Sequence, residues 1–82
     1  MTMPGFRVQV YYGSQRTKAV ETRTEILKKF SQTAAYIIYQ QPNFKLRLGD
    51  FKTRIEAMKL LDEVRHDYPQ AFIVKDEVKL PE

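Results

Sequence analysis

The sequence contains no cysteine and no tryptophan, and it has only three glycines and one histidine among its 82 residues. Without cysteine there can be no disulfide bond, no thiolate nucleophile and no thiolate ligand for a metal. No stretch of about eighteen apolar residues is present, so the sequence predicts no membrane-spanning segment. The first residues, MTMPG, lack the apolar segment of a secretory signal peptide, so none is expected here.

Candidate catalytic residues are also scarce. His66 lies near the end of a predicted helix, where a histidine suits the negative end of the helix dipole. Asp50 is explained as a turn residue, and Asp62 and Glu63 as part of a solvated helix face. The sequence offers no metal-ligand cluster, no nucleophile–base pair and no glycine-rich phosphate loop. We therefore expect no enzyme activity, no cofactor and no metal.

The charge balance is mildly basic, with 14 lysines and arginines against 10 aspartates and glutamates and a net charge of +4. This excess favours an anionic partner such as nucleic acid, acidic polysaccharide or a membrane surface. No run of like charge exceeds two residues, which excludes a polybasic tail but allows a localised basic surface. The length of 82 residues fits one small domain.

The chain begins with an alternating pattern that is followed by a helical one. Phe6, Val8 and Val10 alternate with polar residues, which is typical of a strand buried on one side, and Gly13 ends the pattern. Over residues 17–31, apolar residues recur roughly at helical spacing. This part of the chain therefore predicts a strand and then a helix.

The same order returns in the second half. Residues 44–50, FKLRLGD, alternate again, and Thr53 with Glu56 forms a capping-box pattern at the start of a second helix. Two short apolar runs, 36–39 and 71–74, predict two more strands. The predicted order is therefore strand, helix, strand, strand, helix, strand.

This order predicts an α+β domain with the β-α-β-β-α-β, ferredoxin-like topology. Such a chain closes best as a four-stranded antiparallel sheet with both helices on one face. We expect residues 1–5 to be a disordered segment, residues 6–75 to form the domain, and residues 76–82 to be a C-terminal tail.

The other face of the sheet is expected to be open to water. Neighbouring residues of a strand point to opposite faces, so the partners of the apolar residues face outward. These partners are Arg7, Gln9, Tyr11, Lys45 and Arg47. Either Tyr36 or Tyr39 joins them, and the pattern cannot choose because that run is apolar on both sides. Guanidinium and amide groups bond hydroxyls and carboxylates, and phenol rings stack on bases or sugars, so this face is expected to bind a polymer.

Three segments carry a resemblance to a known family. They are FRVQVYYGS at residues 6–14, FKLRLGDFKTRIEA at residues 44–57, and YPQAFIV at residues 68–74. Together they resemble a SPOR domain (sporulation-related repeat) over nearly the whole chain. RVQVYYGS and the terminal AFIVKDEVKLP are similar to the branch of the family that is common in Bacteroidetes-type bacteria.

The resemblance implies a non-catalytic module that binds bacterial peptidoglycan. SPOR domains prefer glycan strands from which amidases have removed the stem peptides, and this material is enriched at the division septum. They usually form the C-terminal end of longer exported or membrane-anchored proteins, often division proteins, which implies a periplasmic or cell-envelope location. We expect a monomer whose partner is the glycan strand, without nucleic-acid or membrane contact by this domain.

In the family, binding is attributed to the open sheet face and its adjoining loop. The first-strand glutamine matches Gln9, the third-strand arginine matches Arg47, and the serine after the first glycine matches Ser14. The first loop departs from the family pattern, because residues 13–15 read Gly-Ser-Gln where Gly-x-Phe is usual. The predicted peptidoglycan-binding residues are Arg7, Gln9, Tyr11, Ser14, Tyr36, Tyr39, Lys45 and Arg47.

Removal of the stem peptides frees the lactyl carboxylate of each muramic acid, so the glycan becomes a polyanion with repeating acetamido groups. We expect Arg7, Lys45 and Arg47 to pair with the carboxylates. Gln9 is expected to bond acetamido or hydroxyl groups, while tyrosines pack on the sugar rings. Exposed ion pairs are each worth about 0–1 kcal/mol, so binding should need several contacts and weaken with salt.

Single-stranded RNA binding is the main alternative, because RRM domains share this element order and stack bases on aromatic residues of the sheet. Their third strand reads K/R-G-F/Y-G/A-F-V-x-F/Y, whereas residues 44–51 here read FKLRLGDF. A regulatory or dimerising module is a further alternative, but it would need an apolar open face. Tyr68 and Phe72 are expected in the core rather than at the ligand.

Overall fold

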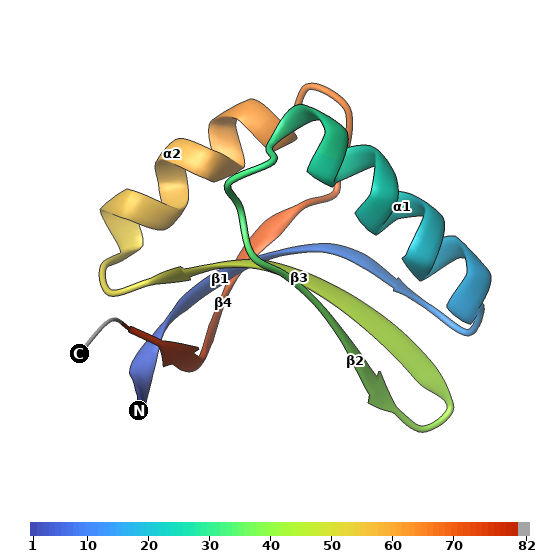
Figure 1. The fold of residues 1–82 in the computed structure, drawn as a ribbon, viewed down its shortest axis with the longest axis horizontal. Coiled ribbons are helices and arrows are strands. Elements are labelled where there is room, and N and C mark those ends of the chain that lie inside the picture. Colours follow the sequence, from blue (N-terminus) through green and yellow to red (C-terminus); the bar gives the residue numbers. More distant parts are fainter. Residues whose placement is uncertain (81–82) are drawn as a thin grey trace.

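The computed structural model describes residues 1–80 and contains a single antiparallel sheet with two helices. The elements are β1 (Thr2–Gly13), α1 (Arg16–Lys29), β2 (Ala35–Gln40), β3 (Asn43–Phe51), α2 (Arg54–Val64) and β4 (Phe72–Lys79). The four strands lie in the order β2-β3-β1-β4. Both helices lie on the same side of the sheet, whose strands curve away from them (Figure 1). The predicted α+β class and the β-α-β-β-α-β order are confirmed.

The two helices begin differently. At the start of α2 the Thr53 side chain accepts from the backbone N–H of Glu56, and the Glu56 carboxylate accepts from the backbone N–H of Thr53. This is the predicted capping box, which satisfies two backbone donors at once. Gln15 precedes α1 without any side-chain cap. Within residues 1–80, neither helix is long and apolar enough to cross a membrane.

The core lies between the helices and one face of the sheet. Its buried members are Val8, Val10, Ile26, Leu46, Leu48, Ala57, Leu61, Val64 and Ala71. The alternate residues of β1 and β3 therefore face the helices as predicted. Phe44 lies on the same side of the sheet but outside this cluster, and its ring packs on that of Tyr39, with 4.8 Å between the ring centroids.

Two β-bulges interrupt the pairing of β1 with β3. Gln9 pairs with Arg47, but Tyr11 pairs with Leu46, so β1 carries one extra residue there. A bulge adds one residue to one strand and changes which face the following residues occupy. Tyr11 therefore lies on the helix side with Leu46, and it packs against the core.

The second bulge lies on β3, opposite Arg7. Val8 pairs with Leu48 and Phe6 pairs with Phe51, which leaves Gly49 and Asp50 opposite a single residue of β1. Gly49 has φ of +81°, and a Cβ there would lie 2.1 Å from the Phe51 ring. Only glycine tolerates this backbone conformation without strain. The bulge turns Asp50 toward Arg7, away from the helices.

The sheet is longer than the sequence predicts. Residues 2–5 of β1 pair with residues 76–79 of β4. The prediction of disorder over residues 1–5 is therefore wrong for 2–5, and the prediction of a tail is wrong for 76–79; residues 81–82 lie outside the described part. The apolar pattern missed these residues because it is backbone pairing that holds them in the sheet. Gly5 allows the Val78 side chain to approach closely, since a Cβ at Gly5 would lie 2.4 Å from Val78 Cγ2.

Candidate functional site

The candidate site is the face of the sheet opposite the helices, called here the open face. It is concave and no helix covers it (Figure 1). Residues directly opposite each other on antiparallel strands share a face. The register therefore places Arg7, Gln9, Tyr12, Tyr36, Ile38, Lys45, Arg47, Phe72 and Val74 together on the open face.

Arg7 lies at the centre of an ion-pair network that also contains Arg47, Asp50 and Asp76. Its Nη2 donates to Asp50 Oδ1 at 2.9 Å and its Nη1 to Asp76 Oδ2 at 3.1 Å. Its Nε donates to the backbone oxygen of Gly49 at 3.2 Å. Arg7 is only 6% exposed. It lies on the predicted face, but the expectation that it is solvent-exposed there is wrong, because the network covers it.

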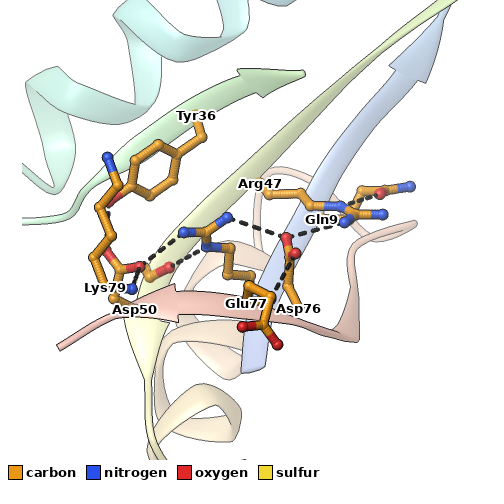
Figure 2. Close-up of polar contacts among 9 residues, drawn as sticks. Gln9, Tyr36, Arg47, Asp50, Asp76, Glu77 and Lys79 are labelled. Carbon is orange, nitrogen blue, oxygen red and sulfur yellow. Dashed lines mark hydrogen bonds and ion pairs between the residues drawn. The ribbon is translucent and has the colours of Figure 1, made fainter. Parts of the chain in front are cut away.

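Arg47 joins this network to Gln9. Its Nη1 donates to Asp76 Oδ2 at 3.0 Å, and its Nε donates to Gln9 Oε1 at 2.9 Å, as Figure 2 shows. Gln9 is also 6% exposed, so its predicted exposure is wrong as well. Within residues 1–80, Arg47 Nη2 and Gln9 Nε2 have no hydrogen-bond partner, yet neither is a buried unsatisfied atom. Both nitrogens therefore remain accessible to a ligand.

Tyr36 is the β2 tyrosine on the open face. It pairs with Arg47 in the register, and its hydroxyl donates to Asp50 Oδ2 at 2.5 Å (Figure 2). The Arg7 guanidinium lies 4.1 Å from the centre of its ring. Tyr39 pairs with Phe44 and therefore lies on the helix side. The alternative that the sequence left open is resolved in favour of Tyr36.

The carboxylates of the network have lowered pKa values. Burial opposes the shift at Asp50, but hydrogen bonds from Arg7, Tyr36 and a backbone N–H outweigh it and lower its pKa. Burial likewise opposes the shift at Asp76, where a hydrogen bond from Arg47 and a backbone N–H lower the pKa. The hydrogen bond to Asp50 raises the pKa of Tyr36. Both carboxylates are therefore ionised at neutral pH, and two positive charges meet two negative ones.

A hollow of about 360 Å³ lies beside Gln9, where β4 begins, and residues from both faces of β1 line it: Gln9, Val10, Tyr11, Tyr12, Gln70 and Phe72. Tyr12 is 59% exposed and Phe72 is 48% exposed. Both lie on the open face, where Phe72 pairs with Gln9 in the register. The prediction that Phe72 belongs to the core is therefore wrong. The hollow combines two accessible rings with the amide of Gln9, a combination that suits the C–H face and the hydrogen-bonding groups of a sugar.

Lys45 differs from the two arginines of the open face. Within residues 1–80 it forms no ion pair with a carboxylate, and its Nζ donates to Gln40 Oε1. The Nζ lies 5.8 Å from the centre of the Tyr12 ring. It therefore remains available to an anionic group, as does Lys79, whose Nζ lies 5.4 Å from the centre of the Tyr36 ring and forms no ion pair within residues 1–80. Ser14, in the connection between β1 and α1, is exposed.

The residues that the sequence missed have identifiable signals. Tyr12, rather than Tyr11, lies on the open face because of the bulge after Gln9. The extra tyrosine pair between strand and glycine, absent from the second unit, was the signal for that bulge. Asp76 fell in the predicted tail, and nothing in the apolar pattern marks it. Within residues 1–80 no group of three His, Cys, Asp or Glu side chains is placed to hold a metal ion.

Comparisons with known proteins agree with this architecture. The family model that matches is described as SPOR domain, and it covers residues 2–75. Comparison with the curated proteins gave no significant match, and neither did comparison with the solved structures. The match spans both βα units, both bulges and all of the open face except Asp76 and the residues after it.

Proposed function

Because the chain belongs to the SPOR domain family, whose members are peptidoglycan-binding modules, we propose that its open face binds glycan strands from which the stem peptides have been removed. The observation that carries the proposal is an uncovered concave face on which accessible donors of Gln9 and Arg47 lie beside two exposed aromatic rings. A glycan offers hydroxyl and acetamido groups to such donors and apolar C–H faces to such rings.

The geometry also favours a strand without peptides. The hollow beside Gln9 has aromatic walls that include Tyr12 and Phe72. A sugar ring packs on such walls only at van der Waals distance. A stem peptide on every second sugar would hold the strand away from the sheet. Lys45 lies within reach of the Tyr12 ring and is placed to meet a free lactyl carboxylate.

We further propose that the domain acts without catalysis, as a monomer, in the periplasm or cell envelope as the C-terminal part of a longer exported or membrane-anchored protein. SPOR domains occur in envelope proteins of cell division, and enrichment of denuded glycan at the septum would recruit the domain there. A fluorescent fusion of the domain, exported to the periplasm, tests this location by its accumulation at the division site.

The binding itself is tested by a pull-down with amidase-treated sacculi, untreated sacculi and single-stranded RNA. We expect most of the protein on the treated sacculi, less on the untreated ones and none on RNA. Arg47→Ala is expected to weaken binding to the treated sacculi while the circular dichroism spectrum keeps its native shape. Equal retention on both kinds of sacculi would contradict the proposed preference, and retention on RNA alone would favour the RRM-like alternative.

A further inference from the structure

On the open face, Arg7 and Arg47 are paired with the carboxylates of Asp50 and Asp76, and this pairing limits which ligands the two arginines can bind. We propose that Asp76 is a specificity-determining residue that keeps this face from attracting polyanions, so that the domain recognises the uncharged groups of the glycan. The inference rests on the proposed function. It goes beyond that function by excluding attraction to the two arginines as the source of the preference for denuded strands. Lys45 and Lys79 remain as sites for an anionic group.

All three nitrogens of the Arg7 guanidinium already donate to acceptors of the protein, and the group is nearly buried. Its Nε, Nη1 and Nη2 donate to Gly49 O, Asp76 and Asp50 at 3.2, 3.1 and 2.9 Å. Its side chain is 8% exposed, while those of Asp50 and Asp76 are 15% and 20% exposed. A carboxylate that approached Arg7 would first meet these two negative charges. Like charges at such short range repel each other strongly in a partly desolvated site.

The side of the Arg47 guanidinium that faces Asp76 already donates a hydrogen bond to that carboxylate. Asp76 Oδ2 accepts from Arg47 at 3.0 Å and from Arg7 at 3.1 Å, so a single oxygen serves both guanidinium groups. The accessible Nη2 of Arg47 remains a donor, but the charge of the guanidinium is already compensated. A neutral acceptor such as a hydroxyl or an acetamido oxygen uses that donor without repulsion from Asp76. A carboxylate at the same place would lie close to Asp76.

The position of Asp76 depends on the extended part of the sheet. Asp76 pairs with Gly5, and the neighbouring pairs join residues 2–5 to residues 76–79. Val78 packs so closely on Gly5 that an added Cβ would lie 2.4 Å from its Cγ2. The backbone N–H of Lys79 donates to Asp50 at 2.8 Å, which ties the same segment to the other carboxylate. This segment follows the residues that the family model matches, which end at 75.

The experiment compares amidase-treated sacculi before and after their lactyl carboxylates are coupled to methylamine. Coupling removes the negative charge and adds only a methyl amide. The wild type is expected to bind both preparations within a factor of about five, because an exposed ion pair is worth about 0–1 kcal/mol, and to show a weak dependence on salt between 20 and 200 mM. Asp76→Asn removes the counterion of Arg47 and one of the two counterions of Arg7, and it is expected to bind the uncoupled sacculi at least fivefold more tightly. This gain should disappear on the coupled sacculi.

Glu77→Gln is the matched control, because it makes the same charge change at the adjacent, exposed residue. It should behave as the wild type does. The proposal is overturned if coupling abolishes wild-type binding, or if Asp76→Asn and Glu77→Gln bind alike. If circular dichroism shows that Asp76→Asn does not fold, the proposal is still tested by the wild type alone. Its binding to the two preparations, and the salt dependence of that binding, then decide whether the proposal holds. If the wild type binds neither preparation, the proposed function itself is overturned. This result differs from those that overturn only the proposal on Asp76, so the two failures can be told apart.

Discussion

Tyr12 and Tyr39 are equally exposed, at 59% each, but they lie on opposite faces of the same sheet. Tyr12 pairs with Lys45 on the open face, and Tyr39 pairs with Phe44 on the side that carries the helices. The two residues share side-chain type and exposure and differ in the face they occupy. They therefore form a matched pair for locating the binding surface.

Tyr12→Ala is expected to weaken binding to amidase-treated sacculi about two- to tenfold, because a well-placed aromatic contact is worth about 0.5–1.5 kcal/mol. Tyr39→Ala should leave binding within a factor of two of the wild type. The measurement is a titrated sacculus pull-down, with circular dichroism to verify that both variants are folded. If both variants lost binding equally, the open face would not be the binding surface.

Arg7→Ala is expected to act on stability more than on binding. The change leaves Asp50 and Asp76 without their shared cation in a partly buried site. Removing one partner of a buried ion pair costs about 3–5 kcal/mol, and the partial exposure of these carboxylates lowers the expected loss to about 2–3 kcal/mol. Urea unfolding followed by circular dichroism measures this loss.

Lys59→Ala serves as the control for Arg7→Ala. Lys59 is an exposed residue of α2, and replacing it should change the free energy of unfolding by less than about 0.5 kcal/mol. An Arg7→Ala variant with wild-type stability and weakened sacculus binding would return Arg7 to the role of ligand donor that the sequence predicts.

Thr53→Ala is expected to lower stability and to leave binding unchanged. It removes the cap of α2, and the loss of such a cap costs about 1 kcal/mol of stability. Thr53 lies at the start of a helix, away from the open face, so sacculus binding should be unchanged. Thr24→Ala, at an exposed position inside α1, is the matched control and should cost no stability because alanine favours helix more than threonine does. Equal losses in the two variants would contradict the capping role.

The alternation of apolar and polar residues predicted the fold well, because strand parity and helical spacing follow directly from burial. It placed Val8 and Leu46 in the core and Arg47 on the open face. Parity fails where a strand gains a residue, and the bulge after Gln9 therefore moved Tyr11 to the helix side. The alternation of apolar and polar residues does not reveal that a strand contains an extra residue. Only the comparison between the two repeats could have revealed this bulge.

The electrostatics of the site could not be predicted in the same way. Asp50 and Asp76 are 26 positions apart in the sequence, and both contact Arg7 because β3 and β4 flank β1 on its two sides. A count of charges on the open face included the arginines and missed these two counterions. Asp50 was interpreted as a turn residue, although the positive φ of Gly49 forms a bulge that directs Asp50 toward Arg7.

The lowered pKa values of Asp50 and Asp76 make stability dependent on pH in the acidic range. Burial opposes both shifts, but hydrogen bonds from the two arginines, from Tyr36 and from backbone N–H groups lower both values. An aspartate in the unfolded chain has a pKa of about 3.9. The unfolded chain therefore binds protons before the folded one does, and the stabilisation is complete above about pH 5. It is lost progressively as the pH falls through the lower pKa values of the folded protein.

Thermal unfolding measured between pH 7 and pH 2 checks this dependence. The wild type should show a melting temperature that is steady down to about pH 5 and then falls. The double variant Asp50→Asn with Asp76→Asn should be less stable at pH 7, because both arginines lose their counterions, and should show a shallower fall in acid. Asp62→Asn changes an exposed helix residue and should retain the wild-type slope. An unchanged acid slope in the double variant would mean that other carboxylates, outside the network, govern the acid transition.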